Sequence, residues 1–274
     1  MMALEPMGGL ANRMRVIASG LNLVKNSNRE LHVIWNLNED LNCEFDVLFM
    51  PIKGVSIIDK ERKYVFAHHS FNLLLYKKIK AYFRNKLLGI DYFINEMDLL
   101  AGRVSHSFIE KMAKKNKNIY IKTTHRFANI DEEINQFCPS ESIQRLIDQQ
   151  VFQYNPNTIG IHIRRDDNEI SILKSPVRLF VEKIEEELKN NKDTTFYLAT
   201  DDMEVEQELI NIFGKNILVR KKVLNRNNKD GIIDALIDMY CLSKTKYIYG
   251  SYWSSFSRMA SLVGHIKLNV LSIN

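Results

Sequence analysis

The sequence predicts an α/β protein with two halves, and three observations support this fold class. Strand-like runs alternate with helix-like segments, a pattern typical of parallel, doubly wound sheets. The 274 residues exceed the usual size of one domain, and a hydrophobic content of 45% can supply a large core. Several predicted strands end in charged or small polar residues, at the sheet edge where open α/β proteins bind ligands. We expect one domain over residues 1–150 and another over 151–274, facing each other across a cleft.

The first half opens as a βαβ unit around the turn that contains Gly8 and Gly9. Its predicted elements are a short initial strand, a helix over 11–25, a strand over 31–35, a helix over 71–90, a strand over 118–124 and a helix that starts at Pro139 and Ser140. The helix over 71–90 has a basic face, which fits peripheral contact with an anionic membrane, although a solvated face explains it as well.

The second half alternates strands and helices more regularly, which predicts a parallel sheet. Its predicted strands cover 158–163, 195–200, 216–220 and 246–250, and its predicted helices cover about 176–190, 203–213, 231–243 and a stretch from Ser254 onward. No internal repeat or low-complexity segment interrupts this order.

The strand over 158–163 ends in the motif HIRRDD. Strand alternation places His162 and Arg164 on one side, with Arg165 beyond the strand end. A guanidinium binds two phosphate oxygens with parallel hydrogen bonds and stays charged at any working pH, which suits a pyrophosphate leaving group. The alternative is a structural cluster of Arg–Asp ion pairs, but the histidine before the arginines and the carboxylates after them favour a ligand site.

The strand over 195–200 ends in two carboxylates, Asp201 and Asp202. Asp201 is placed to orient His162 or Arg164 from the neighbouring strand end. Asp202 fits equally well as the N-cap of the next helix. Neither Asp pair has the Asp-x-Asp spacing of manganese-dependent sugar transferases, so we expect no metal site.

The strand over 246–250 leads into the segment GSYWSSFSR, where small polar residues precede a helix. Free N–H groups at a helix start bind phosphate, and the hydroxyls of Ser254 and Ser255 add donors. The alternative is that these serines only cap the helix. The segment is not a GxxxxGK[ST] loop, so it does not predict nucleoside triphosphate hydrolysis.

The composition narrows the function classes. The chain has 38 basic and 33 acidic residues, and its net charge of +5 suits an anionic ligand without requiring nucleic acid. Three dispersed cysteines indicate neither a disulfide framework nor a zinc site. Because we see no leader peptide and no apolar run long enough to cross a membrane, we expect a cytoplasmic protein.

Five segments, in order, carry a family resemblance: GGLANR, HIRRDD, FYLATDD, DALIDMYCLS and GSYWSSFSR. They resemble the nucleotide-sugar-dependent fucosyltransferases of the nodulation-type and core α-1,6 branch, together with the protein O-fucosyltransferases. The resemblance covers most of the chain. It implies a GT-B-like fold of two Rossmann-like domains, with an acceptor-side N-terminal domain and a C-terminal domain that holds GDP-fucose. It also implies transfer with inversion and without a metal.

The resemblance also implies roles for individual residues. Arg164 resembles the arginine on the donor β-phosphate, and Arg165 its supporting neighbour. Asp238 resembles the aspartate that contacts the guanine. The other residues expected to bind the donor are His162 and Asp201 in the nucleotide pocket, Ser254, Ser255 and Phe256 along the diphosphate, and Asn12 facing the sugar from the other domain.

Activation of the acceptor is assigned less directly. The lysine that often follows this motif in the family is Asn168 here. Glu169 is the nearest carboxylate after the motif and the first candidate for a general base, and Asp167 is the second.

The sequence therefore predicts an enzyme that moves fucose from GDP-fucose, as a substrate and not as a resident cofactor, to a hydroxyl of a glycan acceptor, with a role in polysaccharide biosynthesis. Two alternatives stay open: an inverting transferase for another nucleotide sugar, and a protein that binds a sugar nucleotide without turnover.

Overall fold

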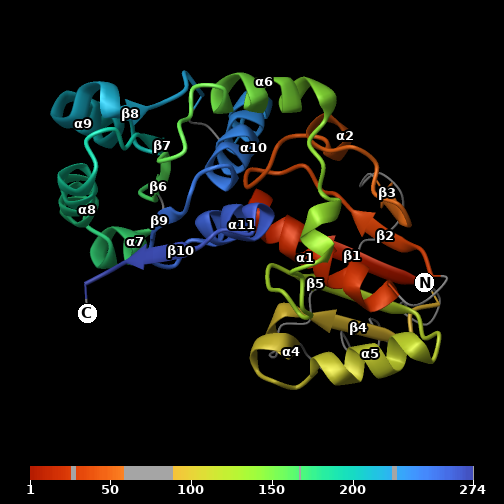
Figure 1. Cartoon of the computed structure of the whole chain (residues 1–274). Coiled ribbons are helices and arrows are strands. Elements are labelled where there is room, and N and C mark those ends of the chain that lie inside the picture. Colours follow the sequence, from red (N-terminus) through yellow and green to blue (C-terminus); the bar gives the residue numbers. More distant parts are fainter. Residues whose placement is uncertain (26–28, 59–88, 167, 224–226, 274) are drawn as a thin grey trace. The chain divides into compact units, whose positions relative to one another are not determined.

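The chain forms two compact units. The computed structural model describes residues 1–25, 29–58, 89–166, 168–223 and 227–273 (Figure 1). The first unit consists of Met1–Asp40 and Glu44–Phe137, and the second of Leu41–Cys43 and Cys138–Asn274. The division expected at residue 150 lies beyond this boundary, because helix α6 (Glu141–Val151) packs on α10 (Lys229–Ser243) and so joins the second unit.

The first unit is built on a parallel sheet with the strand order β3-β2-β1-β5-β4 among the described residues. These strands are β1 (Met2–Pro6), β2 (Leu31–Ile34), β3 (Val55–Ile58), β4 (Tyr92–Asn95) and β5 (Ile119–Thr123). The helices in the described part of this unit are α1 (Leu10–Val24), α2 (Phe45–Leu48), α4 (Glu96–Leu100) and α5 (His106–Lys114), with a 3₁₀ turn η1 (Glu133–Gln136). The predicted βαβ opening and the strand over 118–124 are confirmed. The predicted basic helix over 71–90 falls almost wholly outside the described residues.

The turn between β1 and α1 is fixed from within by the arginine of the GGLANR segment. Gly8 has a φ of +74°, a left-handed conformation that favours glycine. The buried Arg13 donates from Nε to the Gly8 carbonyl at 2.8 Å and from Nη2 to Asn38 Oδ1 at 2.8 Å. Its guanidinium lies 5.0 Å from the centre of the Trp35 ring, and burial lowers the pKa of Arg13 to about 10. Arg13 therefore ties this turn to the segment that follows β2.

The second unit has a parallel sheet with the strand order β10-β9-β6-β7-β8 among the described residues. Its strands are β6 (Ile159–Ile163), β7 (Phe196–Thr200), β8 (Ile217–Leu218), β9 (Ile248–Ser251) and β10 (Leu268–Leu271). Its further helices are α7 (Glu169–Lys174), α8 (Val177–Asn190), α9 (Met203–Phe213) and α11 (Ser255–Gly264), with a 3₁₀ turn η2 (Gly214–Asn216). With β6 counted as the first strand this is the order 5-4-1-2-3, the arrangement of nucleotide-binding doubly wound sheets.

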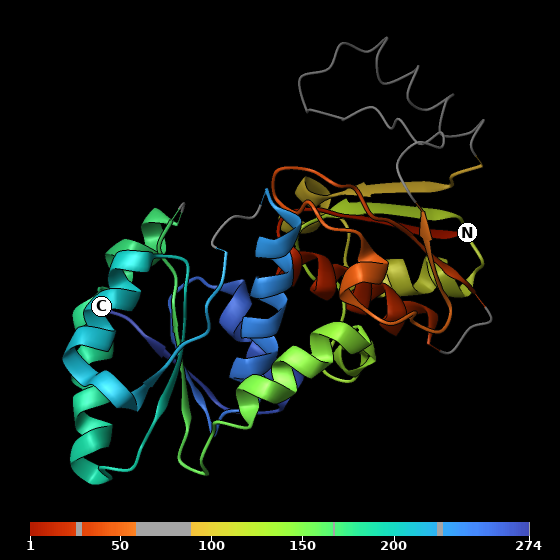
Figure 2. The ribbon, with the colours of Figure 1, turned by 90° about the horizontal axis from the view of Figure 1, so that it is seen from above.

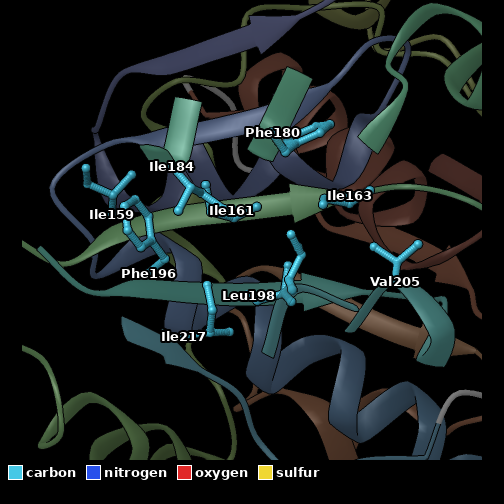
Figure 3. Packing of buried hydrophobic residues seen from close by; sticks show 10 residues of the cluster. Ile159, Ile161, Ile163, Phe180, Ile184, Phe196, Leu198, Val205 and Ile217 are labelled. Atoms are coloured by element: carbon cyan, nitrogen blue, oxygen red, sulfur yellow. The ribbon is translucent and has the colours of Figure 1, made fainter. Parts of the chain in front are cut away.

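Helices cover both faces of the second sheet, as Figure 2 shows, with α8 and α9 on one face and α10 and α11 on the other. Figure 3 shows the core under α8 and α9, whose labelled members are Ile159, Ile161, Ile163, Phe180, Ile184, Phe196, Leu198, Val205 and Ile217. Each such side chain contributes about 1.5–3 kcal/mol when it is fully buried. The continuous apolar character of β6 and β7 follows from this two-sided burial.

The strands and helices predicted for the second half are confirmed with small shifts at their ends, and α7 and β10 were not predicted. In the first unit β3, β4, α2, α4 and α5 were not predicted. Cys43, Cys138 and Cys241 are all free thiols. Of the helices in the described ranges, none combines the length and apolar character that crossing a bilayer requires.

The contact between α10 and α11 depends on the absence of a side chain at Gly264. A Cβ there would lie 2.1 Å from the carbonyl oxygen of Ser243, a backbone atom that cannot easily move aside. We expect Gly264→Ala to lower the free energy of unfolding by about 1–3 kcal/mol, although alanine is the better helix former. Urea unfolding measures this. Arg258→Ala, on the exposed side of α11, should stay within about 0.5 kcal/mol of the parent, and equal stability of both variants would contradict the close contact.

Candidate functional site at the carboxyl edge of the second sheet

The strand order places a topological switch point between β6 and β9. His162 of β6 lies opposite Ala199 of β7 on one side and Gly250 of β9 on the other. The segments that follow these three strands therefore emerge at one edge of the sheet, where open α/β proteins bind ligands. We call this edge the strand-end site. It consists of His162, Arg164 and Arg165 from β6 and its end, Asp201 after β7, and residues 251–257 at the end of β9 and the start of α11.

Asp201 organises the two arginines. Its carboxylate forms an ion pair with Nη1 of Arg164, and its Oδ1 accepts a hydrogen bond from the backbone N–H of Arg165 at 2.7 Å. The backbone N–H of Arg164 donates to Oγ of Ser251 at 3.0 Å. The sequence left open whether Asp201 orients His162 or Arg164, and the structure shows Arg164 as its partner. The guanidinium of Arg164 is thereby fixed at the switch point.

Arg165 points elsewhere. It is 7% exposed and donates through Nη2 to the carbonyl of Ser175, just beyond α7. Burial lowers its pKa, and its Nε and Nη1 have no hydrogen-bond partner among the described residues. The two adjacent arginines are therefore not equivalent: Arg164 is held by a carboxylate at the edge, whereas Arg165 is buried beside α7.

His162 is a neutral group at physiological pH. It is 6% exposed, and its ring stacks on Phe256 with the ring centroids 4.8 Å apart. Burial, followed by the charges of Arg164 and Lys222, lowers the pKa of His162 to about 3. Its Nδ1 has no hydrogen-bond partner in the described part of the chain. It can exchange a hydrogen bond with a ligand but does not act as an acid near neutral pH.

The start of α11 presents further unused polar groups. Ser254 occupies the N-cap position without a side-chain capping bond. The Oγ atoms of Ser254 and Ser257 are buried, and neither has a partner among the described residues. No acidic side chain lies in the first turn of this helix. Hydroxyls and unpaired backbone N–H groups at a helix start are suited to an anion.

Trp253 precedes this helix with a φ of 57° and is 69% exposed. A positive φ at a bulky residue costs energy and occurs most often near functional sites.

Asp238 lies in a separate buried cluster on α10. Its Oδ1 accepts from the Tyr197 hydroxyl at 2.5 Å, and its Oδ2 accepts from Lys222 Nζ at 3.0 Å. Burial opposes the charge on Lys222, but Asp238 and then Glu206 raise its pKa overall. Both oxygens of Asp238 are thus already used within the unit. Since each carboxylate oxygen has a second lone pair, contact with a guanine stays a prediction.

The other predicted residues belong to other elements or lie outside the described residues. Asn12 belongs to the first unit, in the first turn of α1, and its buried Oδ1 has no partner among the described residues. Glu169 is exposed at the first position of α7. Asp202 caps α9, and its side chain accepts hydrogen bonds from the N–H groups of Glu204 and Val205. This confirms the prediction that Asp202 is the N-cap of that helix. Asp167 lies outside the described residues.

Some residues in or beside the strand-end site were not singled out from the sequence. Ser251 contacts the backbone of β6, and Ser257 packs against Gly250. Lys222 is close enough to His162 to lower its pKa, although no motif marks it. Both serines lie in the segment GSYWSSFSR, which the sequence analysis did select. Considering every hydroxyl of that segment, and not only Ser254 and Ser255, would have included them. No three His, Cys, Asp or Glu side chains gather into a metal-binding cluster in the ranges that the structure describes.

Comparison with known proteins gives the fold. No protein-family model matches the chain, and no curated protein matches it. Solved structures do match. The NodZ α-1,6-fucosyltransferase from Bradyrhizobium, soaked with GDP-fucose, is 17% identical with a TM-score of 0.62 over 96% of this chain and 92% of that chain.

Two further structures are similar over nearly the whole of this chain. POFUT1 in complex with GDP is 11% identical, with a TM-score of 0.59 over 99% of this chain and 98% of that one. A variant of Arabidopsis thaliana FUT1 in complex with GDP is 16% identical, with a TM-score of 0.56 over 98% and 69%. The chain has the fold of these fucosyltransferases. The expected GT-B-like α/β fold class is thus confirmed.

The neutral state of His162 predicts a specific pH dependence of stability. Between about pH 6.5 and pH 3 the unfolded chain binds a proton at this residue and the folded chain does not, so stability falls as the pH falls. One such proton changes the free energy of unfolding by up to about 1.4 kcal/mol per pH unit. Urea unfolding between pH 4.5 and 6 should show a shallower loss for His162→Gln than for the parent. The partly exposed His32, changed to Gln, serves as the control, and identical slopes for all three proteins would contradict a neutral His162.

Proposed function

We propose that this chain is a glycosyltransferase that moves fucose from GDP-fucose to a glycan hydroxyl, with inversion at the anomeric carbon and without a metal ion. The proposal is supported by one combined observation: the strand-end site has groups suited to a nucleotide diphosphate, and solved structures of the same fold bind GDP or GDP-fucose. The strand-end site gathers an arginine, unpartnered buried polar atoms and a helix start. Solved structures with the same fold are complexes with GDP or GDP-fucose.

The donor diphosphate would lie against Arg164 and the start of α11. As the bond to the sugar breaks, negative charge grows on the departing diphosphate, and preorganised donors stabilise that charge. The guanidinium of Arg164, the hydroxyl of Ser254 and the first N–H groups of α11 supply such donors. Asp201 keeps Arg164 in position, so no reorganisation is required when the charge develops.

Other residues complete the donor pocket. His162 would give a neutral hydrogen bond, and the Phe256 ring holds the imidazole in place. Ser255 adds a hydroxyl to the first turn of α11, and Arg165 supports the loop after β6 through Ser175. Asp238 would select guanine through its remaining lone pairs, and Asn12 would face the sugar from the acceptor-side unit.

The positive charge in this proposal comes from arginine and backbone N–H groups, so no step is assigned to a metal. Glu169, with Asp167 as the second candidate, stays the sequence-predicted base. A cytoplasmic location, a role in polysaccharide biosynthesis and peripheral membrane contact stay predictions.

Nucleotide selectivity tests the donor class. We expect GDP at 100 to 1,000 times its dissociation constant to stabilise the chain by about 2.7–4.1 kcal/mol in thermal or urea unfolding. UDP and ADP at the same concentration should stabilise it less, because their bases lack the guanine edge. Equal stabilisation by all three nucleotides would contradict a guanine-selective pocket.

Arg164→Lys tests the role of the arginine. Lysine keeps the charge but loses the planar arrangement of two donors, so we expect release of GDP from GDP-fucose to fall roughly 100- to 1,000-fold. The melting temperature should change little. A variant that is destabilised but fully active per folded molecule would instead make Arg164 a structural ion-pair residue.

Arg145→Lys is the matched control, since Arg145 is an exposed arginine in an ion pair with Glu141 on α6. All assays contain EDTA. Turnover that appears only after manganese is added would contradict the metal-free proposal, and a parent protein that binds GDP without ever releasing it from GDP-fucose would be a binding protein.

A further inference from the structure

Trp253 lies in the strand-end site, but the proposed function assigns it no role. It directly precedes Ser254, the N-cap of α11, where the diphosphate is proposed to bind. Its φ of 57° is unfavourable for a bulky side chain, and 69% of the residue is exposed. Backbone strain of this kind persists only where the surrounding structure holds it, and it concentrates at ligand contacts. The proposed function leaves this strain unexplained.

Two hydrogen bonds fix the loop that carries Trp253. The Trp253 carbonyl accepts from Nδ2 of Asn168 at 3.3 Å, and the backbone N–H of Tyr252 donates to Oγ of Ser175 at 2.7 Å. Asn168 is the N-cap of α7 and Ser175 its C-cap, so both ends of this short helix hold the loop. The contacts of the loop with α7 therefore set the position of the indole.

Large apolar side chains are exposed along this edge of the second sheet. Each of the segments that follow β6, β7 and β9 carries one: Ile170 of α7 is 51% exposed, Met203 of α9 is 73% exposed, and the third is Trp253. On α7 the usual pattern is reversed, because Ser171 is buried while Ile170 and Leu173 are exposed. Exposed apolar side chains beside a polar site are suited to the apolar part of its ligand.

The two faces of the sheet offer different surroundings to the two ends of the donor. Asp238 of α10 accepts from Tyr197 of β7, so the proposed guanine contact lies on the sheet face that α10 and α11 cover (Figure 2). Trp253 is held instead by α7, which leads into α8 on the other face. With the base toward Asp238 and the diphosphate at Ser254, the sugar end of the donor is left toward Trp253.

We propose that Trp253 determines the donor sugar by contacting the methyl group of the fucosyl residue. This inference rests on the proposed function. Fucose is a 6-deoxy sugar, so it carries a methyl group where most hexoses carry a hydroxymethyl group. The indole offers a large apolar surface to this methyl, whereas a hydroxyl on the same carbon would lose its hydrogen bonds to water there.

Two donors that differ by one oxygen atom test this role. GDP-fucose and its 6-hydroxy analogue share the base, the diphosphate and the sugar ring, and the release of GDP to water is measured for both without an acceptor. We expect the parent to favour GDP-fucose roughly 10- to 100-fold in kcat/KM, because an apolar site rejects an added hydroxyl by about 100-fold at most. In Trp253→Ala this preference should fall to about threefold or less, since the apolar contact is gone.

Binding of GDP alone separates a contact with the sugar from a contact with the nucleotide. GDP has no sugar beyond the ribose, so it should stabilise Trp253→Ala and the parent equally in thermal unfolding. Trp253→Phe keeps an aromatic ring at the same position and should retain most of the preference for GDP-fucose.

Ile212→Ala is the matched control, because Ile212 is 52% exposed near the far end of α9. If Trp253→Ala keeps the parent's preference, or if the parent does not favour GDP-fucose over the analogue, the inference is wrong and the proposed function stands. Loss of GDP binding in folded Trp253→Ala would make the residue a nucleotide contact and would also contradict the inference. If the parent releases no GDP from either donor, the proposed function fails and the inference fails with it.

Discussion

The parallel register that holds β6 between β7 and β9 determines where every polar group of the strand-end site lies. His162 sits opposite Ala199 and Gly250, small residues that leave room for an imidazole in a central strand. Two residues later the chain has left the sheet at Arg164, beside Asp201 from the next strand end. A slip of one residue would move every β6 side chain to the opposite face of the sheet and take Arg164 away from Asp201. The core under α8 and α9 therefore fixes the chemistry at the edge.

Each unit also buries a carboxylate that a tyrosine and a lysine satisfy. In the first unit Glu5 accepts from the Tyr120 hydroxyl and from Lys122 at 2.7 Å. In the second, Asp238 accepts from Tyr197 and Lys222. Removing one member of such a buried pair typically costs about 3–5 kcal/mol, because the remaining charge is left without a partner. These clusters explain why a charged residue inside an apolar helix or strand need not mark a ligand site.

The strands and helices of the second half could be predicted from the sequence, because its strands are short apolar runs followed by charged or polar residues. The contact between Glu96 and His125 could not be predicted from the sequence. It joins the ends of two strands that are far apart in the chain, and one of them, β4, has no clear strand pattern in its sequence. The same reasoning that selected Arg164 would have selected His125, which follows a correctly predicted strand. For Asp238 the motif could be recognised in the sequence, but its hydrogen-bond partners could not. Tyr197 and Lys222 lie on other segments of the chain, and only the folded structure brings them to Asp238.

All strands within each described sheet run in the same direction. In the second sheet every strand therefore begins at one edge and ends at the other, and the two edges differ in their residues. The polar groups of the strand-end site gather where the strands end. At the opposite edge, the loop over 191–195 before β7 is held by hydrogen bonds from Asn155 to the Asp193 carbonyl and from Asn216 to the Thr194 carbonyl. Lys192 and Asp193 in that loop are exposed. A fluorescent label or surface attachment at the side chain of Lys192 or Asp193 would therefore leave the residues of the strand-end site, at the opposite edge of the sheet, unchanged.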